Sequence, residues 1–283
     1  MITPFTSNDE FNEQGLRDNI DWLITEGVHG LISTGSTSEF ASLSDEELKQ
    51  VIRVSVEQAS GRVPVMAGTA ANSTRATIER TQYAQSVGAD AALIVSPYYG
   101  LPTQEELIEH YKSVSQNVDI HIMLYNNPWF SGVDMTPETI AGLADFPNIR
   151  YIKESSADMR RVHEIQRLCG ENIEVWCGWD DLALECFLMG CPGWVCPTSN
   201  FLPKICAELF ELAESMKYQE ARELYFTLLP FLHYLESGQL VAKAKEALNI
   251  LGKAGGLPRR PFLPLTPEQK AKLEVMLQSI GAI

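Results

Sequence analysis

The chain has 283 residues, of which 45% are hydrophobic and 21% charged, as in an ordinary globular protein. Its formal net charge of -15 argues against nucleic acid and anionic membranes as partners. No apolar run reaches the roughly 20 residues of a membrane-spanning helix, and the first residues lack the basic segment and apolar core of a signal peptide. We therefore expect a cytoplasmic protein that is not bound to a membrane.

Short apolar runs alternate with amphipathic stretches over the first 200 residues. Eight runs have the pattern of strands, namely 2–5, 30–35, 63–68, 91–96, 120–125, 149–153, 173–177 and 193–197. Helical patterns lie between them at 45–59, 74–87, 104–116, 137–143, 160–168 and 181–189. Ser44 with Glu47, and Thr103 with Glu106, have the spacing of capping boxes. Gly27, Gly88 and Gly190 stand where helices are expected to end.

Strands that alternate with helices imply a parallel sheet, which is either doubly wound or closed into a (β/α)8 barrel. Eight strands and this length favour the barrel, which typically has about 250 residues. The Gly-x-Gly-x-x-Gly turn of the open dinucleotide-binding fold is missing after the first strand. From residue 202 onwards helical patterns continue without strands (207–216, 218–233, 240–251 and 267–280). We expect a barrel over residues 1–200 and a C-terminal helical region, residues 201–283, packed on it.

The six cysteines all lie in the second half of the chain, and none forms a Cys-x-x-Cys pair. Their spacing matches no common zinc motif. Several lie in apolar segments, where cysteine behaves as a small buried hydrophobic residue. The sequence therefore predicts free thiols, as in a reducing cytoplasm, and no metal site.

Lys153 lies near the C-terminal end of the predicted strand 149–153. Side chains alternate across a strand, so Lys153 points to the face opposite to that of Ile152 and Glu154. Inside a closed barrel an ammonium group loses hydration, and a neutral amine is a nucleophile for carbonyl groups. The alternative is a lysine on an edge strand that keeps the sheet soluble.

Polar residues gather at the same ends of the other predicted strands, where the reactive groups of such a barrel lie. They are Thr3 and the segments 35–39 (Gly-Ser-Thr-Ser-Glu), 96–99 (Ser-Pro-Tyr-Tyr), 125–128 (Tyr-Asn-Asn-Pro), 178–181 (Gly-Trp-Asp-Asp) and 197–200 (Pro-Thr-Ser-Asn). This rim of hydroxyls, amides and one amine favours a functional Lys153.

In this order and spacing, these motifs resemble the dihydrodipicolinate synthase/N-acetylneuraminate lyase family of class I aldolases over nearly the whole chain. The resemblance is carried by Thr3-Pro4-Phe5, Gly35-Ser36-Thr37-Ser38-Glu39, Pro97-Tyr98-Tyr99, Tyr125-Asn126-Asn127-Pro128, Ile152-Lys153-Glu154 and Gly178-x-Asp180-Asp181. It implies that Lys153 forms an imine with a 2-oxo acid such as pyruvate. The imine acts as an electron sink, so that no further cofactor is expected.

The resemblance also implies roles for other residues of the rim. Tyr125 matches the tyrosine that passes protons to and from the imine and the substrate. Ser36 and Thr37 match the hydroxyl pair that binds the substrate carboxylate, with help from backbone N–H groups of the same loop. Ser38 stands where the family usually has glycine, and a positive φ at this position would be costly for serine.

Tyr99 matches a tyrosine that members of this family insert into the site of the neighbouring subunit, where it completes a hydroxyl relay with Ser36 and Tyr125. A homodimer or homotetramer is therefore expected. Gly178 and Val195 match positions that line the pocket. Asp180 and Asp181 have no His or Glu at metal-ligand spacing, and we expect them to cap the following helix.

The chain departs from the family pattern after Pro128. Dihydrodipicolinate synthases carry an arginine two residues beyond this proline, where it binds the carboxylate of the aldehyde substrate. Phe130 stands there instead and cannot form a bidentate ion pair.

This departure favours a Schiff-base lyase or aldolase that cleaves, condenses, dehydrates or deaminates a 2-keto acid. The first alternative is 4-hydroxy-tetrahydrodipicolinate (dihydrodipicolinate) synthase. The second is a non-catalytic 2-oxo-acid-binding protein.

Overall fold

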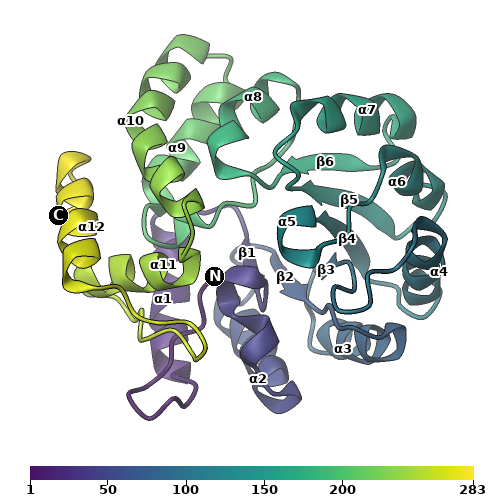
Figure 1. Cartoon of the computed structure of the whole chain (residues 1–283), viewed down its shortest axis with the longest axis horizontal. Helices are drawn as coiled ribbons and strands as arrows, with labels where there is room; N and C mark the ends of the chain where they lie inside the picture. The colour runs from purple at the N-terminus through teal and green to yellow at the C-terminus, as the bar shows by residue number, and fades with distance from the viewer. The chain divides into compact units, whose positions relative to one another are not determined.

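The computed structural model describes all 283 residues of the chain. Helices and strands alternate along much of the sequence (Figure 1), and the residues group into two compact units. The first unit combines Met1–Val65 with Cys196–Ile283, and the second is Met66–Val195. The chain therefore leaves the first unit once and returns to it once.

The second unit is built on a parallel sheet whose strands follow the order of the chain. The strands are β2 (Val65–Gly68), which begins at the last residue of the first unit, β3 (Ala91–Val95), β4 (His121–Asn126), β5 (Ile149–Glu154) and β6 (Glu174–Cys177). In the register, Val95 pairs with Tyr125, and Tyr125 pairs with Lys153. All five residues of β3 are buried, as expected for a parallel sheet that is covered on both faces.

The helices of the second unit alternate with these strands. They are α3 (Thr74–Ser86), α4 (Gln104–Ser115), α5 (Pro128–Ser131), α6 (Pro137–Leu143), α7 (Met159–Cys169) and α8 (Ala183–Leu188), with a 3-10 turn at Asp180–Leu182. In Figure 1, α3, α4, α6 and α7 lie along the outer side of the sheet, whereas the short α5 follows the C-terminal end of β4. The prediction of an α/β fold with a parallel sheet is confirmed.

The first unit is mostly helical. It contains α1 (Glu13–Thr25), β1 (Leu31–Ser33), α2 (Asp45–Ala59), α9 (Pro203–Glu214), α10 (Tyr218–Glu236), α11 (Leu240–Ile250) and α12 (Pro267–Ser279). Three 3-10 turns lie at Ser36–Ser38, Phe40–Ser42 and Thr198–Asn200. The helices predicted beyond residue 202 are therefore present, and α1 is an addition to the predicted ranges.

The prediction of eight strands is wrong by two, because segments 2–5 and 193–197 form single bridges, Phe5 with Phe11 and Cys177 with Trp194. In the first segment, bonds that involve side chains take the place of a ladder. Ile2 N–H donates to Asn200 Oδ1 at 2.8 Å, and Thr3 Oγ1 donates to Ser38 O at 2.9 Å. Prolines within both segments (Pro4 and Pro197) also lack the N–H that a strand needs.

Local signals predicted the helix ends well. Both expected capping boxes are formed, at Ser44 with Glu47 and at Thr103 with Glu106. Gly27, Gly88 and Gly190 all have positive φ, as a residue that releases a helix requires. These ends depend on contacts within one turn, and so a single sequence suffices to locate them.

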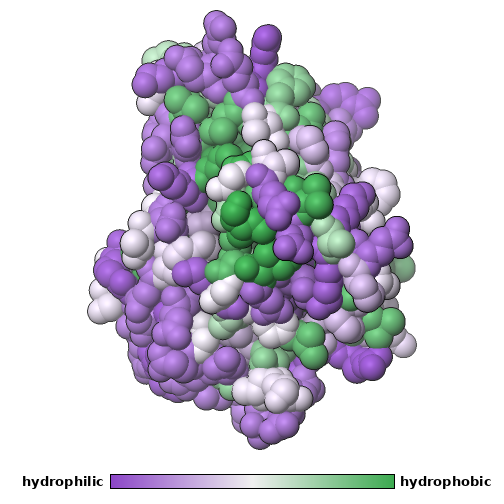
Figure 2. Space-filling view, turned by 90° about the vertical axis from the view of Figure 1, so that its left-hand side faces the viewer, coloured by the Kyte–Doolittle hydropathy of each residue, from purple (hydrophilic) through white to green (hydrophobic).

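No helix is both long and apolar enough to cross a membrane. Figure 2 shows hydrophobic residues among hydrophilic ones on the side of the first unit where α10 and α12 lie. Exposed large hydrophobic residues of these two helices include Tyr218 and Phe226 on α10 and Val275 on α12. Contiguous exposed apolar surface is typical of sites that contact another protein.

The buried histidine of α4 makes stability depend on pH. His110 is 6% exposed, and burial lowers its pKa to about 4. Its Nδ1 lies 2.9 Å from Thr74 Oγ1. Between pH 6.5 and 4 the unfolded chain binds a proton at this residue that the folded chain does not bind, so stability falls as pH falls through this window.

We expect protonation of His110 to lower the free energy of unfolding by at most about 3 kcal/mol between pH 6.5 and 4. Denaturant unfolding of wild type and His110→Gln at pH 7, 6, 5 and 4 measures this loss of stability. The variant should lose less stability over this range than wild type. Parallel curves for the two proteins would contradict the prediction.

Candidate active site

Lys153 and Tyr125 lie side by side at the C-terminal ends of neighbouring strands. They are partners in the register of β4 and β5, and the Lys153 Nζ atom is 4.2 Å from the centre of the Tyr125 ring. Both side chains are buried, with 8% of Lys153 and 4% of Tyr125 exposed. The parallel sheet thus places an amine beside a phenol in surroundings that are largely closed to water.

Asn127 holds the phenol in place. Its Nδ2 donates to Tyr125 Oη at 2.8 Å. Its Oδ1 accepts from Phe130 N at 3.1 Å and so caps the short helix α5. One side chain therefore fixes the proton-bearing oxygen and starts the helix that carries Phe130. Asn127 appears in the sequence motif, but its role was not predicted.

Gly178 follows β6 and lies against Lys153. Its N–H donates to Glu154 O at 2.9 Å, and its carbonyl accepts from Ser155 Oγ at 2.8 Å. A Cβ atom on this residue would lie 2.7 Å from Lys153 Cγ and 2.1 Å from Ser155 Oγ. Glycine is therefore required here by close approach, because any side chain would meet the lysine.

Aromatic residues follow the C-terminal ends of two of these strands, Trp129 and Phe130 after β4 and Trp179 after β6. Trp129 Nε1 donates to Ser156 O at 3.2 Å, and the rings of Trp129 and Trp179 lie 6.2 Å apart. Phe130 is 68% exposed. The position after Pro128 thus presents an apolar surface where the family pattern has a guanidinium group.

In the first unit, Ser36 and Thr37 lie in the 3-10 turn Ser36–Ser38 that follows β1, and both are half-buried. Ser38 is not among the residues with positive φ, which answers the question raised by serine at this position. Two residues of the loop after β1 have positive φ, Thr34 at 50° and Glu39 at 60°. The turn is closed by Ser38 N–H, which donates to Gly35 O at 3.0 Å.

A buried ion pair anchors this loop from beneath, and sequence reasoning missed it. Lys245 Nζ lies 2.5 Å from Glu39 Oε1, and the two side chains are 1% and 0% exposed. Arg259 N–H donates to Glu39 Oε2 at 2.8 Å. The Phe5 ring lies under both cations, 4.2 Å from Lys245 Nζ and 3.9 Å from Arg259 Cζ. Burial lowers the pKa of Lys245, which Glu39 opposes.

The structure places Tyr99 and Val195 in the second unit. Asn72 Oδ1 accepts from both Tyr98 N and Tyr99 N, at 3.1 and 3.2 Å, whereas the Tyr99 side chain is 89% exposed. Val195 N–H donates to Cys177 O at 2.8 Å, which places this residue beside the end of β6.

Asp180 and Asp181 do not cap the following helix as predicted. The cap positions are Trp179 for the 3-10 turn and Leu182 for α8, and neither has a side-chain cap bond. Asp180 is instead buried and accepts from Trp194 Nε1 at 2.9 Å. A tertiary contact thus uses this carboxylate. No group of three or more His, Cys, Asp or Glu residues is arranged to hold a metal ion.

Residues 1–280 match the model of the Dihydrodipicolinate synthetase family. A 4-hydroxy-tetrahydrodipicolinate synthase of Thermodesulfovibrio yellowstonii is 39% identical over 285 residues, which cover 100% of this chain and 97% of that protein. Two solved structures are similar over 100% of this chain. One is the chloride-inhibited dihydrodipicolinate synthase of Acinetobacter baumannii complexed with pyruvate (TM-score 0.97, 34% identity, 97% of that chain). The other is described as the first monomeric dihydrodipicolinate synthase variant (TM-score 0.96, 30% identity, 95% of that chain).

Proposed function

Since the chain belongs to the dihydrodipicolinate synthetase family, we propose that Lys153 forms a Schiff base with pyruvate or a related 2-oxo acid. The protein is a lyase of the class I type, in which a lysine of the enzyme forms the imine. The observation that carries the assignment to Lys153 is the buried amine 4.2 Å from the ring of Tyr125. The solved relative with bound pyruvate supports this substrate class.

The chemistry follows from these two side chains. The Lys153 nitrogen attacks the ketone carbon, and loss of water from the carbinolamine gives a protonated imine. Removal of a proton from the adjacent carbon yields an enamine, whose electron pair can form or break a bond at that carbon. Tyr125 passes protons between the substrate and the imine, and Asn127 fixes the phenol oxygen. Aldol cleavage, condensation, dehydration and deamination all proceed from this enamine.

Ser36 and Thr37 bind the carboxylate of the 2-oxo acid in this proposal. Their half-buried hydroxyls lie in a 3-10 turn whose end is anchored by the buried Glu39. A turn of this kind offers backbone N–H groups as well as hydroxyls to an anion. Gly178 and Val195 line the substrate pocket, and Phe130 bounds the second substrate.

Tyr99 completes a hydroxyl relay with Ser36 and Tyr125 of a neighbouring subunit, which makes the protein a homodimer or homotetramer. The exposed ring on a loop held by Asn72 supports this role, as does the hydrophobic surface of the first unit (Figure 2). Sedimentation velocity tests the assembly. Tyr99→Phe is expected to slow turnover without changing the unfolding temperature, and an unchanged rate would exclude Tyr99 from the relay.

We also propose that the sheet closes into a (β/α)8 barrel over residues 1–200, with residues 201–283 as a helical extension. Within the first unit, Ile2 bonds to Asn200, and Met1 N donates to Ile32 O. In a closed barrel the first strand lies between the second strand and the last, and these two bonds join the first residues to segments in both positions. The six free cysteines support a cytoplasmic location.

Borohydride trapping tests the proposed function directly. Wild type incubated with pyruvate and borohydride should gain one reduced adduct, located on Lys153 by peptide mass spectrometry. Lys153→Ala should gain none, and Lys112→Ala, which changes a half-exposed lysine of α4, should react like wild type. Binding of pyruvate without any adduct would favour a non-catalytic binding protein.

The names of the relatives favour a second candidate, 4-hydroxy-tetrahydrodipicolinate synthase. Phe130 is the observation against it, because a phenyl ring cannot bind the carboxylate of aspartate semialdehyde. A bidentate arginine at this position would add roughly 1.5–3 kcal/mol of binding.

Condensation of pyruvate with aspartate semialdehyde, measured for wild type, Phe130→Arg and Phe130→Gln, distinguishes the two candidates. The first candidate, a Schiff-base lyase or aldolase for another 2-keto acid, predicts poor wild-type activity in this condensation. It also predicts a rise of about 10-fold in kcat/KM for Phe130→Arg. Phe130→Gln removes the ring without adding charge and should not improve activity. An efficient wild type that Phe130→Arg does not improve would establish the second candidate.

A further inference from the structure

A network of polar side chains lies on the opposite face of the two strands that carry Tyr125 and Lys153. Asn126 follows Tyr125 on β4, and Glu154 follows Lys153 on β5. Asn126 and Glu154 are also partners in the register. Because neighbouring side chains alternate across a strand, one pair of positions places the reactive groups and the next pair points away from them.

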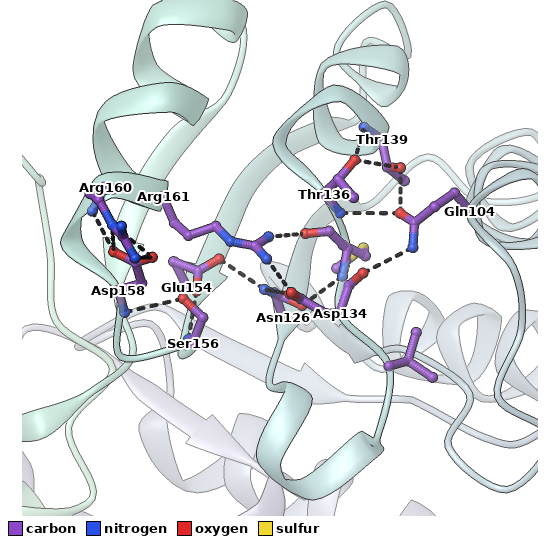
Figure 3. A network of polar contacts seen from close by, with 12 residues as sticks. Gln104, Asn126, Asp134, Thr136, Thr139, Glu154, Ser156, Asp158, Arg160 and Arg161 are labelled. Atoms are coloured by element: carbon purple, nitrogen blue, oxygen red, sulfur yellow. Dashed lines mark hydrogen bonds and ion pairs between the residues drawn. The ribbon is translucent and has the colours of Figure 1, made fainter.

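The second pair is buried and joined by hydrogen bonds (Figure 3). Asn126 is 0% exposed, and its Nδ2 donates to Glu154 Oε2 at 3.0 Å. Glu154 is 5% exposed, and its Oε1 accepts from Ser156 N at 2.6 Å. Both carboxylate oxygens therefore receive an N–H donor. Burial raises the pKa of Glu154, and these hydrogen bonds oppose the rise.

The same network continues into the segment before α6 and into α7. Asn126 Nδ2 also donates to Asp134 Oδ1 at 3.1 Å, and Asn126 Oδ1 accepts from Met135 N at 3.0 Å. Arg161 of α7 donates to Met135 O at 2.6 Å and pairs with the Asp134 carboxylate. Figure 3 shows Arg161 reaching from its helix towards Asp134, beside Asn126. The C-terminal ends of β4 and β5 are thus tied to each other and to two flanking segments.

We propose that Glu154 and Asn126 are positioning residues, which fix the ends of β4 and β5 so that the Tyr125 phenol and the Lys153 amine keep their relative placement. The proposal rests on the proposed function of Lys153 and Tyr125. Loss of the Asn126–Glu154 or the Glu154–Ser156 hydrogen bond removes side-chain support from two adjacent strand ends, each one residue from a reactive side chain. Displacements of about 1 Å in such an arrangement are enough to slow catalysis strongly.

Glu154→Gln tests the proposal with little change of shape. The amide keeps one acceptor and presents an NH2 group to the donor of Asn126 or Ser156, so that one bond of the network is lost. The measured quantity is the rate at which solvent deuterium enters the methyl group of pyruvate, followed by NMR. This rate reports enamine formation, and it requires no second substrate.

For Glu154→Gln we expect the exchange rate at saturating pyruvate to fall about 10-fold, while half-saturation changes less than about threefold. A purely structural role would lower the unfolding temperature and leave exchange at 20 °C unchanged, and that result would overturn the proposal. Arg160→Ala is the matched control, because Arg160 also lies on α7 but pairs with Asp158 at the surface (Figure 3). It should exchange at the wild-type rate.

Asp134→Asn decides the question if Glu154→Gln does not fold, since Asp134 lies at the half-exposed edge of the network. A fall of about threefold in the exchange rate supports the proposal, and an unchanged rate overturns it. The wild-type protein distinguishes a failure of this inference from a failure of the proposed function. If wild type neither exchanges deuterium nor forms an adduct with pyruvate, the proposed function is wrong. If wild type is active and the variants exchange at the same rate, only the positioning role is wrong.

Discussion

Replacing Gly178 by alanine is expected to reduce turnover by about 100-fold, because the new methyl group must displace Lys153, the lysine that we propose to form the imine. The added Cβ would lie 2.7 Å from Lys153 Cγ, 2.7 Å from Glu154 O and 2.1 Å from Ser155 Oγ. The backbone oxygen of Glu154 cannot move without moving β5. The side chains of Lys153 and Ser155 must also turn away from the methyl group. Steady-state kinetics and the rate of borohydride trapping at Lys153 measure this effect.

Gly142→Ala is the control for this variant. Gly142 lies in α6 of the same unit, and a Cβ there meets only Ile108 Cδ1 at 3.7 Å, which is an ordinary contact. Alanine in a helix is favoured over glycine by about 0.5–1 kcal/mol, so this variant should be active and slightly more stable. A Gly178→Ala enzyme that traps pyruvate as fast as wild type would show that Lys153 tolerates the methyl group.

The second large effect is expected on stability, from breaking the buried pair of Glu39 and Lys245. Glu39→Gln leaves the Lys245 ammonium buried without its counter-charge, and Lys245→Met does the same to the carboxylate. Each single change should lower the free energy of unfolding by about 3–5 kcal/mol. Denaturant unfolding at pH 7 measures the loss.

The double variant Glu39→Gln, Lys245→Met gives the sharper test, because it removes both charges together. It should be more stable than the sum of the single losses predicts, since the buried pair gains little over uncharged residues of similar size. Arg75→Ala, which breaks an exposed pair with Glu79 on α3, should leave stability unchanged. Additive losses for Glu39 and Lys245 would show that the two residues do not interact.

These two effects differ in how far a sequence could reveal them. Gly178 belongs to a motif, so its importance was predicted, but the reason is the approach of Lys153 and Ser155 from another strand. Lys245 gave no signal, because it lies among helical residues far from Glu39 in the chain. Arg259, which bonds to the same carboxylate, is 220 positions away from Glu39. Pairs of this kind are set by packing and cannot be found from local pattern.

The two strands that were predicted but not found also show that local sequence pattern does not decide tertiary contacts. Segments 2–5 and 193–197 have the composition of strands, and each forms only a single bridge. Whether an apolar run forms a ladder depends on what lies beside it, and here Asn200 and Ser38 bind the first segment by their own polar atoms. Asp180 was similarly predicted to cap a helix, but its carboxylate accepts a hydrogen bond from Trp194 instead.

By itself the sequence determined the alternation of strands and helices, the capped helix starts, and the identity of the residues expected to carry chemistry. These follow from interactions between residues within a turn or from the two-residue period of a strand. Only the tertiary structure decided that Lys153 lies beside Tyr125, that Gly178 leaves room for the lysine, and that Glu154 with Asn126 forms a buried network behind them. Such relations arise when separate strands take a common register, and no single stretch of the chain encodes them.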